Sequence, residues 1–421
     1  MNFEQLGLKD TILQAVEREH FKEPTEIQIK TIPLILEGKD VIAQSATGSG
    51  KTLAFGAGII QHTVHGKGLQ ALVLTPTREL TEQVTQALQK FCHNQLSIQA
   101  IYGGVGIGPQ IRALPNADVV VATPGRMLDH LERGTIQLNK IHTLVLDESD
   151  RMIDMGFIRD VERILHGCPK ERQTLLFSAT LSPEIGHIAR KHMKTPIKVI
   201  AETYVDPSKL SQIYYDVPRN QKLSLLAHFI QQETSGLVMV FCNTRRITDF
   251  VAKALKHANI YATPIHGGLT QSKRSNTLER FHSQKSQVLV CTDVAARGLD
   301  IQGVSHIYNY DIPNDPKQYV HRIGRTARAG KEGKVINLLS PQDHDYFGMV
   351  LREYNIKIAK GITPKVQPLQ VPAQEERPRR FSPRTNGPRH GEARRNFGGS
   401  SSERPQRERN PRDRPNRFGK A

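Results

Sequence analysis

Short, nearly continuous apolar runs recur along the chain, and each is followed by a segment with helix-like spacing of apolar residues. The runs read DVIAQS, ALVLTP, DVVVATP, TLVLDES and TLLFSAT in the first half, and LVMVFCNT, QVLVCTD and HIYNYD in the second. Runs of this length that are rich in Val, Leu and Ile are typical of strands buried on both faces of a sheet. Their alternation with helical segments indicates parallel βαβ units. The pattern therefore predicts two α/β domains in tandem.

The two sets of runs are separated by the polar, Pro-containing segment AETYVDPSKLSQ at residues 201–212. We expect a first domain over residues 1–203, a linker over 204–212 and a second domain over 213–362. An ordinary long surface loop is the alternative reading of this segment.

The composition changes at Thr363. From there to residue 421 the chain has no apolar periodicity and holds 13 Arg and 2 Lys against 6 acidic residues. Such a segment buries too little apolar surface to offset the entropy of ordering, so we expect a disordered tail. Arginine binds phosphates in bidentate fashion and stacks on bases, and Phe381, Phe397 and Phe418 could add stacking platforms. The tail is predicted to bind nucleic acid without sequence preference; a merely solubilising tail is the alternative.

The overall charge points to the same kind of partner. The 421 residues include 58 Lys and Arg against 41 Asp and Glu, a net charge of +17, which favours a polyanion such as nucleic acid. The four cysteines are far apart in the sequence and are expected to be buried, reduced thiols rather than zinc ligands or disulfides. The N-terminus does not resemble a signal peptide and no apolar run approaches 18 residues, so we expect a cytoplasmic protein without membrane association.

The segment SATGSGKT, residues 45–52, lies between a predicted strand and a predicted helix, which is the context of a phosphate-binding P-loop. Gly48, Ser49 and Gly50 would bring backbone N–H groups around phosphate oxygens. Lys51 would face the β- and γ-phosphates, and the Thr52 hydroxyl could bind Mg²⁺.

A second predicted strand ends in DESD, residues 147–150. Taken alone, these carboxylates could form a solvated turn, a metal site or a catalytic pair. Together with a P-loop, Asp147 becomes a candidate ligand of Mg²⁺, partly through water, and Glu148 a candidate base for the water that attacks the γ-phosphate.

Further short segments accompany these two motifs in a fixed order. They read PTEIQ, PTREL, GG, TPGR and SAT in the first half, and VFCNT, HGGLTQSKR, TDVAARGLD and HRIGRTAR in the second. The set resembles the DEAD-box ATP-dependent RNA helicases of superfamily 2, with DESD in place of DEAD, over roughly residues 3–360. The resemblance implies two RecA-like domains with parallel sheets that close on ATP, Mg²⁺ and single-stranded RNA.

The resemblance also assigns roles to individual residues. Phe3 and Gln28 would read adenine, and Gly298 and Asp300 would lie near the ribose and γ-phosphate. Arg325 and Arg328 would act with Lys51, Asp147 and Glu148 in catalysis, as arginine fingers from the second domain. Asp150, Ser178, Thr180 and His321 would couple hydrolysis to movement of the domains. The expected contacts with the RNA backbone are Pro76, Arg78, Gly104, Thr123, Gly125, Arg126, Arg245, Gly267, Gln271, Arg274 and Thr292.

Three positions depart from the usual pattern of this family. Ser45 and Ser149 stand where Ala is usual, and a buried Ser149 would need a partner for its hydroxyl group. Ala327 stands where Gly is usual, which would cost free energy if the backbone there has a positive φ, and could shift Arg328. No departure removes a charged catalytic group.

The motif set favours an RNA-stimulated ATPase that unwinds short duplexes or remodels ribonucleoproteins, contacts RNA largely without sequence preference and acts as a monomer. An RNA-annealing protein that works through its basic tail is a second hypothesis. A DNA-directed translocase of superfamily 2 is a third, which PTEIQ and SAT disfavour.

Overall fold

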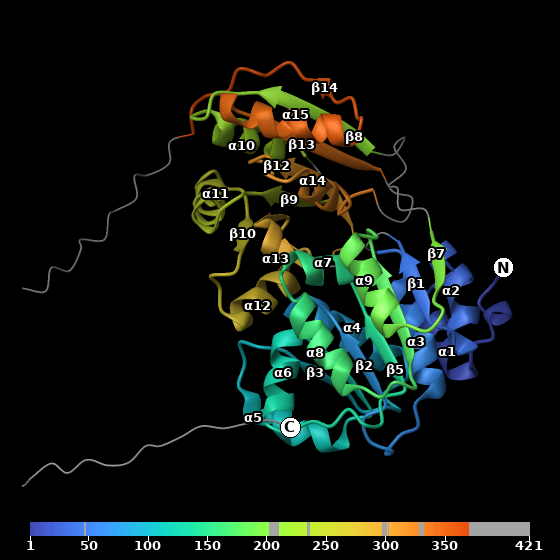
Figure 1. Ribbon diagram of the computed structural model, residues 1–421. Helices are drawn as coiled ribbons and strands as arrows, with labels where there is room; N and C mark the ends of the chain where they lie inside the picture. Colours follow the sequence, from blue (N-terminus) through green and yellow to red (C-terminus); the bar gives the residue numbers. More distant parts are fainter. Residues whose placement is uncertain are drawn as a thin grey trace, which may run out of the picture. The chain divides into compact units, whose positions relative to one another are not determined.

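The computed structural model describes residues 1–45, 48–201, 210–233, 236–296, 301, 303–327 and 332–369. These residues belong to one compact unit that contains two seven-stranded parallel sheets, each with its own helices (Figure 1). We call the part built on the first sheet lobe 1 and the part built on the second sheet lobe 2.

Lobe 1 is a parallel sheet in the order β3-β4-β2-β5-β6-β1-β7. Its strands are β1 (Val41–Gln44), β2 (Ala71–Leu74), β3 (Ile98–Ile101), β4 (Val119–Ala122), β5 (Thr143–Leu146), β6 (Gln173–Ser178) and β7 (Ile197–Ile200). Its helices are η1 (Glu4–Leu6), α1 (Asp10–Arg18), α2 (Glu26–Leu36), α3 (Lys51–His62), α4 (Arg78–Phe91), α5 (Ile107–Ala113), η2 (Leu114–Asn116), α6 (Pro124–Glu132), α7 (Ser149–Asp154), α8 (Ile158–Gly167) and α9 (Pro183–His192).

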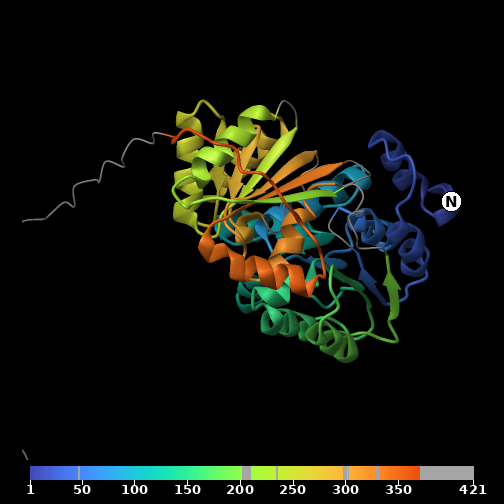
Figure 2. The same ribbon diagram turned by 90° about the horizontal axis from the view of Figure 1, so that it is seen from above.

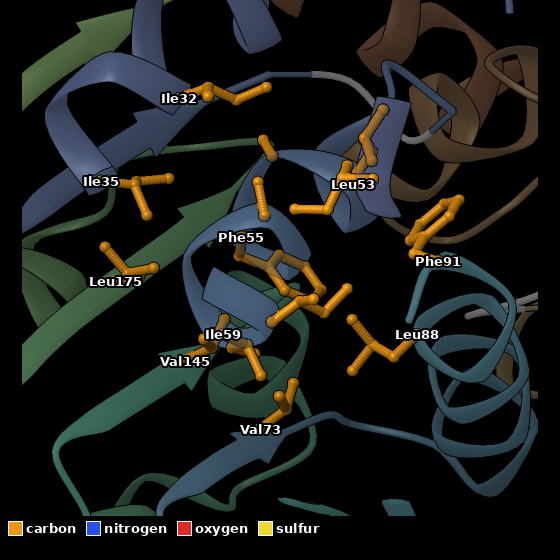
Figure 3. Close-up of a cluster of buried hydrophobic side chains, with 14 of the residues drawn as sticks. Ile32, Ile35, Leu53, Phe55, Ile59, Val73, Leu88, Phe91, Val145 and Leu175 are labelled. Atoms are coloured by element: carbon orange, nitrogen blue, oxygen red, sulfur yellow. The ribbon is translucent and has the colours of Figure 1, made fainter. Parts of the chain in front are cut away.

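Alternate residues of the strands β1 to β6 enter two different cores, because successive side chains of a strand point to opposite faces of the sheet. One core lies under α1 to α4. The other lies under α6 to α9. Figure 3 shows the first core, in which side chains from α2, α3 and α4 meet those of the strands. The labelled residues are Ile32, Ile35, Leu53, Phe55, Ile59, Val73, Leu88, Phe91, Val145 and Leu175.

Lobe 2 repeats this topology in the order β10-β11-β9-β12-β13-β8-β14, and its sheet and helices can be followed from a second direction in Figure 2. Its strands are β8 (Leu210–Asp216), β9 (Leu237–Phe241), β10 (Ala262–Ile265), β11 (Val288–Cys291), β12 (Val304–Asn309), β13 (Gly333–Leu339) and β14 (Ala359–Lys360). Its helices are α10 (Lys222–Gln232), α11 (Arg245–His257), α12 (Gln271–His282), α13 (Asp293–Ala296), α14 (Pro316–Ile323), η4 (Pro341–Asp343) and α15 (His344–Glu353).

The similarity between the two lobes extends to the residues that cap α4 and α11. Thr77 follows β2 and caps α4, its hydroxyl accepting from Leu80 N at 3.3 Å. Thr244 follows β9 and caps α11 in the same way, accepting from Ile247 N at 3.2 Å. A threonine just before a helix satisfies a backbone N–H that has no partner within the helix. Each cap fixes the start of a helix whose first residue, Arg78 or Arg245, is a predicted RNA contact.

The predicted fold class of two tandem RecA-like α/β domains with parallel sheets is confirmed. All eight apolar runs named above contain strands of the structure. None of the eight runs corresponds to β3, β7, β8, β10, β13 or β14. Several of these lack a continuous apolar run, since β7 is exposed at three of its four residues and β10 contains Pro264.

Both predicted limits of the second domain need correction. The last three residues of the expected linker belong to β8, which begins at Leu210. The expected tail also begins too early. The Thr363 hydroxyl donates to Asp216 O at 2.9 Å, and Leu369 N donates to Ser224 Oγ at 2.9 Å. Residues 363–369 therefore pack on lobe 2, and the rest of the predicted tail lies outside the described residues.

The four cysteines, Cys92, Cys168, Cys242 and Cys291, are free and buried, as predicted. Burial raises the pKa of the Cys168 thiol to about 11, and a protonated thiol is a poor nucleophile. Within the part of the chain that the structure describes, no helix is both long and apolar enough to cross a membrane.

Candidate nucleotide and nucleic-acid sites

The P-loop connects β1 to α3. Gly48 and Gly50 have φ angles of +81° and +88°, which glycine adopts at little cost. Gly50 directly precedes Lys51, the first residue of α3. The Ser49 hydroxyl donates to Ser45 Oγ at 3.0 Å. The buried serine that departs from the family pattern therefore has a partner inside the loop.

Gln28 braces the P-loop from α2. Its side-chain Nε2 donates to Gly50 O at 3.0 Å, while its Oε1 accepts from Thr25 N at 3.0 Å. Thr25 Oγ1 in turn donates to Ser49 O at 2.7 Å. A Cβ added at Gly50 would lie 2.4 Å from Gln28 Nε2, so this close approach also requires glycine. Gln28 thus ties the segment PTEIQ to the phosphate cradle, and its predicted contact with adenine stays a prediction.

Two buried polar atoms at this site have no hydrogen-bond partner among the described residues. They are Lys51 Nζ and Asp147 Oδ1, on residues that are 6% and 2% exposed. Burial raises the pKa of Asp147 to about 6, with Lys51 opposing the shift. Leaving a buried charged group without a partner is costly, and such groups usually bind something. A triphosphate would satisfy Lys51, and a divalent cation would satisfy Asp147, so these residues fit the predicted nucleotide and Mg²⁺.

Glu148 adjoins this pair in an unusual backbone conformation. Its φ and ψ are +51° and +49°, the left-handed region that non-glycine residues seldom occupy. Its carboxylate accepts from Arg151 Nη1 at 2.5 Å, and both side chains are buried. Burial by itself would raise the pKa of Glu148, but Arg151, Lys51 and Arg325 together hold the pKa below its usual value. Strain at one catalytic candidate is common at active sites.

Asp150 fixes the segment SAT rather than facing the P-loop. Its Oδ2 accepts from Ala179 N at 3.2 Å and from Thr180 N at 3.1 Å. The Thr180 hydroxyl lies 3.4 Å from the same oxygen, and the Ser178 hydroxyl donates to Thr180 O at 2.6 Å. These bonds join Asp150 to two residues of SAT, Ser178 excepted, and the coupling role of Asp150 stays a prediction. The Ser149 hydroxyl donates to Phe177 O at 3.1 Å, so its burial leaves no donor unpaired.

Lobe 2 contributes residues of α14, and the residues that follow it, to the surroundings of Glu148. His321 and Arg325 line a small cavity beside α13, and Arg325 is 2% exposed. Both add to the positive potential at Glu148. The structure therefore brings Arg325 into electrostatic contact with the catalytic candidates of lobe 1. The predicted residues Arg328, Gly298 and Asp300 lie outside the described residues.

The backbone at Ala327 has a positive φ, the conformation in which alanine costs more free energy than glycine. Its φ is +53° and it is 9% exposed. We therefore expect Ala327→Gly to raise the free energy of unfolding by about 1 kcal/mol, the cost of a left-handed conformation less the entropy that glycine loses. Urea unfolding of the full chain measures this. Ala252→Gly, in the middle of α11, is the control and should lower stability by about 2 kcal/mol, from the lower helix propensity of glycine and the loss of a buried methyl group. A destabilised Ala327→Gly would contradict the strain.

A cavity of about 470 Å³ lies where the predicted RNA-binding loops meet. Its walls come from PTREL, GG and TPGR of lobe 1, from HGGLTQSKR of lobe 2, and from Met155, Phe157 and Val294. The predicted RNA contacts that line it are Pro76, Arg78, Thr123, Gly125, Arg126, Gly267 and Arg274. Three arginines line the cavity, so it could hold the phosphates of a nucleic-acid backbone.

The remaining predicted RNA contacts do not line this cavity. Gly104, at φ +82°, lies against the guanidinium of Arg78, which leaves no room for a Cβ. The Arg245 guanidinium lies near Gly267, where a Cβ added to the glycine would be 3.3 Å from Arg245 Nη2. Thr292 is buried and begins the turn into α13. Gln271 is buried and donates to Glu79 Oε1 across the lobes at 3.3 Å.

Sequence reasoning missed three charged residues of these sites: Arg151, Glu79 and Arg322. All three occur in or beside the motifs named above. Arg151 is buried against Glu148, three residues before it, whereas Glu79 and Arg322 pair with residues that are distant in sequence. Arg322 follows His321 and is 1% exposed, and its position three residues after the buried Tyr319 on α14 was the available signal. Since i and i+3 share a face of a helix, Arg322 lies on the same face of α14 as Tyr319 and is buried with it.

Fold and site together define the class of the protein. It is a two-lobed P-loop protein in which a phosphate cradle and a carboxylate pair of one lobe meet an arginine of the other. Two family models match the chain: the DEAD/DEAH box helicase model over residues 25–188 and the helicase conserved C-terminal domain over residues 221–330.

The ATP-dependent RNA helicase CshA of Listeria monocytogenes is 46% identical over 381 residues, which cover 89% of this chain and 71% of that protein. A DEAD-box ATP-dependent RNA helicase CshA of Geobacillus kaustophilus is 47% identical over 346 residues, or 81% of this chain and 74% of that protein. The chain belongs to the DEAD-box helicase family, and the resemblance seen in its sequence is confirmed.

Solved structures of the family agree with the fold. S. cerevisiae Dbp5 bound to RNA and ADP BeF3 superposes with a TM-score of 0.78 at 30% identity, covering 86% of this chain and 96% of that chain. The DEAD-box helicase Mss116 bound to ssRNA and UDP-BeF superposes with a TM-score of 0.77 at 29% identity, covering 87% and 80%.

Proposed function

We propose that this chain is an RNA-stimulated ATPase that binds single-stranded RNA and unwinds short duplexes or remodels ribonucleoproteins. The observation that carries the proposal is the pair of buried, unpartnered groups, Lys51 Nζ and Asp147 Oδ1, beside Glu148 at the P-loop. The membership of this chain in the DEAD-box family supports the choice of ATP and RNA over the substrates of other P-loop proteins.

For hydrolysis, the loop from Gly48 to Gly50 directs backbone N–H groups at the phosphates and Lys51 adds a positive charge. Thr52 and Asp147 would hold Mg²⁺, which supplies neutralisation of the phosphate charge when bound. Glu148 orients the attacking water and accepts its proton, and the low pKa of Glu148 keeps it ionised for that task. Arg325 stabilises the charge that develops on the phosphates, and we assign a second such role to Arg328.

Coupling between the two activities is proposed to run through Asp150. Because the carboxylate of Asp150 binds the backbone of Ala179 and Thr180, movement of DESD is transmitted directly to SAT. His321 helps to lower the pKa of Glu148 and also lines the small cavity beside α13. A change at the γ-phosphate is therefore proposed to reach SAT through Asp150 and lobe 2 through the electrostatic interaction of His321 with Glu148.

RNA is proposed to lie in the 470 Å³ cavity, held by its backbone through Arg78, Arg126 and loop N–H groups. Phosphate contacts carry no sequence information, so the core should have little sequence preference. We assign the Arg-rich tail an additional, salt-sensitive contribution to RNA affinity. Ribonucleoprotein partners, a monomeric state and a cytoplasmic location are part of the same proposal.

The test compares ATP hydrolysis with and without a single-stranded RNA, and with a DNA strand of the same sequence. We expect stimulation by RNA and much less by DNA, because 2′-hydroxyl contacts distinguish the two. Equal stimulation by DNA would favour a DNA translocase. Removing residues 370–421 rather than 363–421 tests the tail without disturbing the contacts of Thr363 and Leu369. Loss of strand annealing with retained RNA-stimulated hydrolysis would assign annealing to the tail.

A further inference from the structure

One edge of lobe 2 adjoins the cavity proposed for RNA. Its edge strand, β10, lies between α11 and α12, which cover opposite faces of the sheet (Figure 1). Both helices begin at the cavity, because the Arg245 guanidinium lies near Gly267, which lines the cavity, and Arg274 lines it from the first turn of α12. We call the exposed charged and aromatic side chains of residues 246–285 the β10 edge.

The β10 edge carries an excess of positive charge. Its exposed Lys and Arg side chains outnumber its exposed carboxylates by six to two. The cations are Arg246, Lys253, Lys256, Lys273, Arg280 and Lys285, and the carboxylates are Asp249 and Glu279. Asp249 Oδ1 lies 2.9 Å from Nε2 of the buried His266, so this carboxylate has a partner other than the six cations. A surface of this charge favours a polyanionic ligand.

Two exposed aromatic rings lie among these cations. Phe250 is 36% exposed and shares one face of α11 with Arg246 and Lys253, at spacings of four and three residues. Tyr261, which is 44% exposed, directly precedes β10, and the Arg280 guanidinium lies 5.6 Å from the centre of its ring and donates to its hydroxyl. Bases stack on exposed rings while Lys and Arg bind phosphates. The β10 edge therefore holds both kinds of group that bind single-stranded nucleic acid.

The β10 edge is also continuous with the cavity. From Arg245 to Lys256 the helix α11 rises about 17 Å, so a strand bound at Arg245 can continue along its exposed face. The described chain ends on the same side of lobe 2, because Leu369 packs on the core that α11 covers. The Arg-rich segment that follows Leu369 thus begins beside this surface.

We propose that the β10 edge is a second RNA-binding surface, which holds the part of a single strand that extends beyond the cavity. Its cations bind phosphates, and Phe250 and Tyr261 stack on bases. This inference rests on the proposed function and adds a surface that none of the RNA contacts predicted from the sequence includes. Because phosphate contacts and stacking carry little sequence information, affinity should depend on the length of the strand rather than on its sequence.

The experiment measures the affinity of the full chain for two fluorescent single-stranded RNAs by anisotropy, over a range of salt concentrations. One RNA is the shortest strand that fully stimulates ATP hydrolysis, and the other extends that strand at both ends. The test variant carries Arg246→Gln, Lys253→Gln and Lys256→Gln. Its affinity for the long strand should fall at least about tenfold, and its slope of log affinity against log salt should decrease by about 2, since each phosphate contact with a single strand contributes about 0.7. Its affinity for the short strand should equal that of the wild-type chain.

Phe250→Ala separates stacking from charge. Loss of one stacking contact should lower the affinity for the long strand about tenfold. The salt slope should not change, because the substitution removes no contact with phosphate and therefore alters no release of counterions.

The matched control removes three exposed cations from lobe 1 by Lys170→Gln, Arg190→Gln and Lys198→Gln. It loses the same net charge as the α11 variant and should bind both strands like the wild-type chain. Circular dichroism checks that each variant is folded. Wild-type affinity of the α11 variant for the long strand, as expected if the β10 edge binds an acidic protein instead, would overturn the inference. Equal losses for both strands, or an equal loss in the control, would also overturn it. A wild-type chain that binds neither strand would instead refute the proposed function.

Discussion

Replacing Glu148 with Gln should lower the rate of ATP hydrolysis by about 10²- to 10⁴-fold, the usual contribution of a general base. Glutamine has nearly the same shape as glutamate but cannot accept the proton of the attacking water. The groups expected to bind the nucleotide, Lys51 and Thr52, remain in place. ATP should therefore still bind, and the variant should accumulate with ATP and RNA bound together.

The variant also removes the charge that Arg151 pairs with at 2.5 Å in a buried site. A buried hydrogen bond to a charged group is replaced by one to an amide, which should cost about 1–3 kcal/mol of stability. The rate must therefore be compared at a temperature where the variant is shown to be folded.

Phosphate release measures hydrolysis, and the affinity for a fluorescent ATP analogue measures binding. Asp154→Asn, at the exposed end of the same helix, is the control and should hydrolyse ATP at the wild-type rate. If Glu148→Gln still turned over ATP as fast as the wild-type chain, Glu148 would not be the base.

The sequence predicted the centre of each sheet well because central strands need continuous apolar runs, as in LVMVF of β9. It missed β13, although that strand is buried, because Asn337 interrupts the apolar pattern. Asn337 is buried for a reason that only tertiary structure reveals: it accepts from Asn309 at 2.7 Å on the neighbouring strand. A polar pair inside a sheet cannot be recognised from one of its members.

In the candidate site, too, some residues can be predicted from local sequence and others only from tertiary structure. Lys51, Asp147 and Glu148 follow from local motifs, because the chemistry of a P-loop fixes residue types at short spacings. Arg151, Glu79 and Arg322 were missed because charge on a helix usually faces solvent. Each is instead buried with a partner: Arg151 with the nearby Glu148, Arg322 with Asp293, and Glu79 with Arg274 of the other lobe. Motifs thus locate the chemistry, while the residues that hold it in place require the structure.

Replacing Arg322 with Met should destabilise lobe 2 by about 3–5 kcal/mol, the cost of removing one partner from a buried ion pair. Arg322 Nε and Nη2 bind the two oxygens of Asp293 at 2.6 Å and 2.7 Å. Its Nη1 donates to Asn309 Oδ1 at 3.0 Å and to Asp311 O at 2.6 Å. Methionine fills similar space but leaves these acceptors buried without a donor.

The loss should extend beyond stability. Asp293 begins α13 directly after Thr292, and Arg325 follows Arg322 by three residues, so one guanidinium holds two predicted functional segments together. We therefore expect RNA-stimulated hydrolysis to fall even at temperatures where the variant is folded. Urea unfolding followed by circular dichroism gives the stability, and phosphate release gives the activity.

Two further variants separate the charge of Arg322 from its geometry. Arg322→Lys keeps the positive charge but cannot donate to Asp293, Asn309 and the backbone at once, because an ammonium group lacks the planar fork of a guanidinium. It should recover only part of the stability. Arg352→Met, on the exposed side of α15, is the control and should be neutral within about 0.5 kcal/mol. Full recovery by lysine would mean that charge alone matters at this position, and a neutral Arg322→Met would show that the buried network does not stabilise lobe 2.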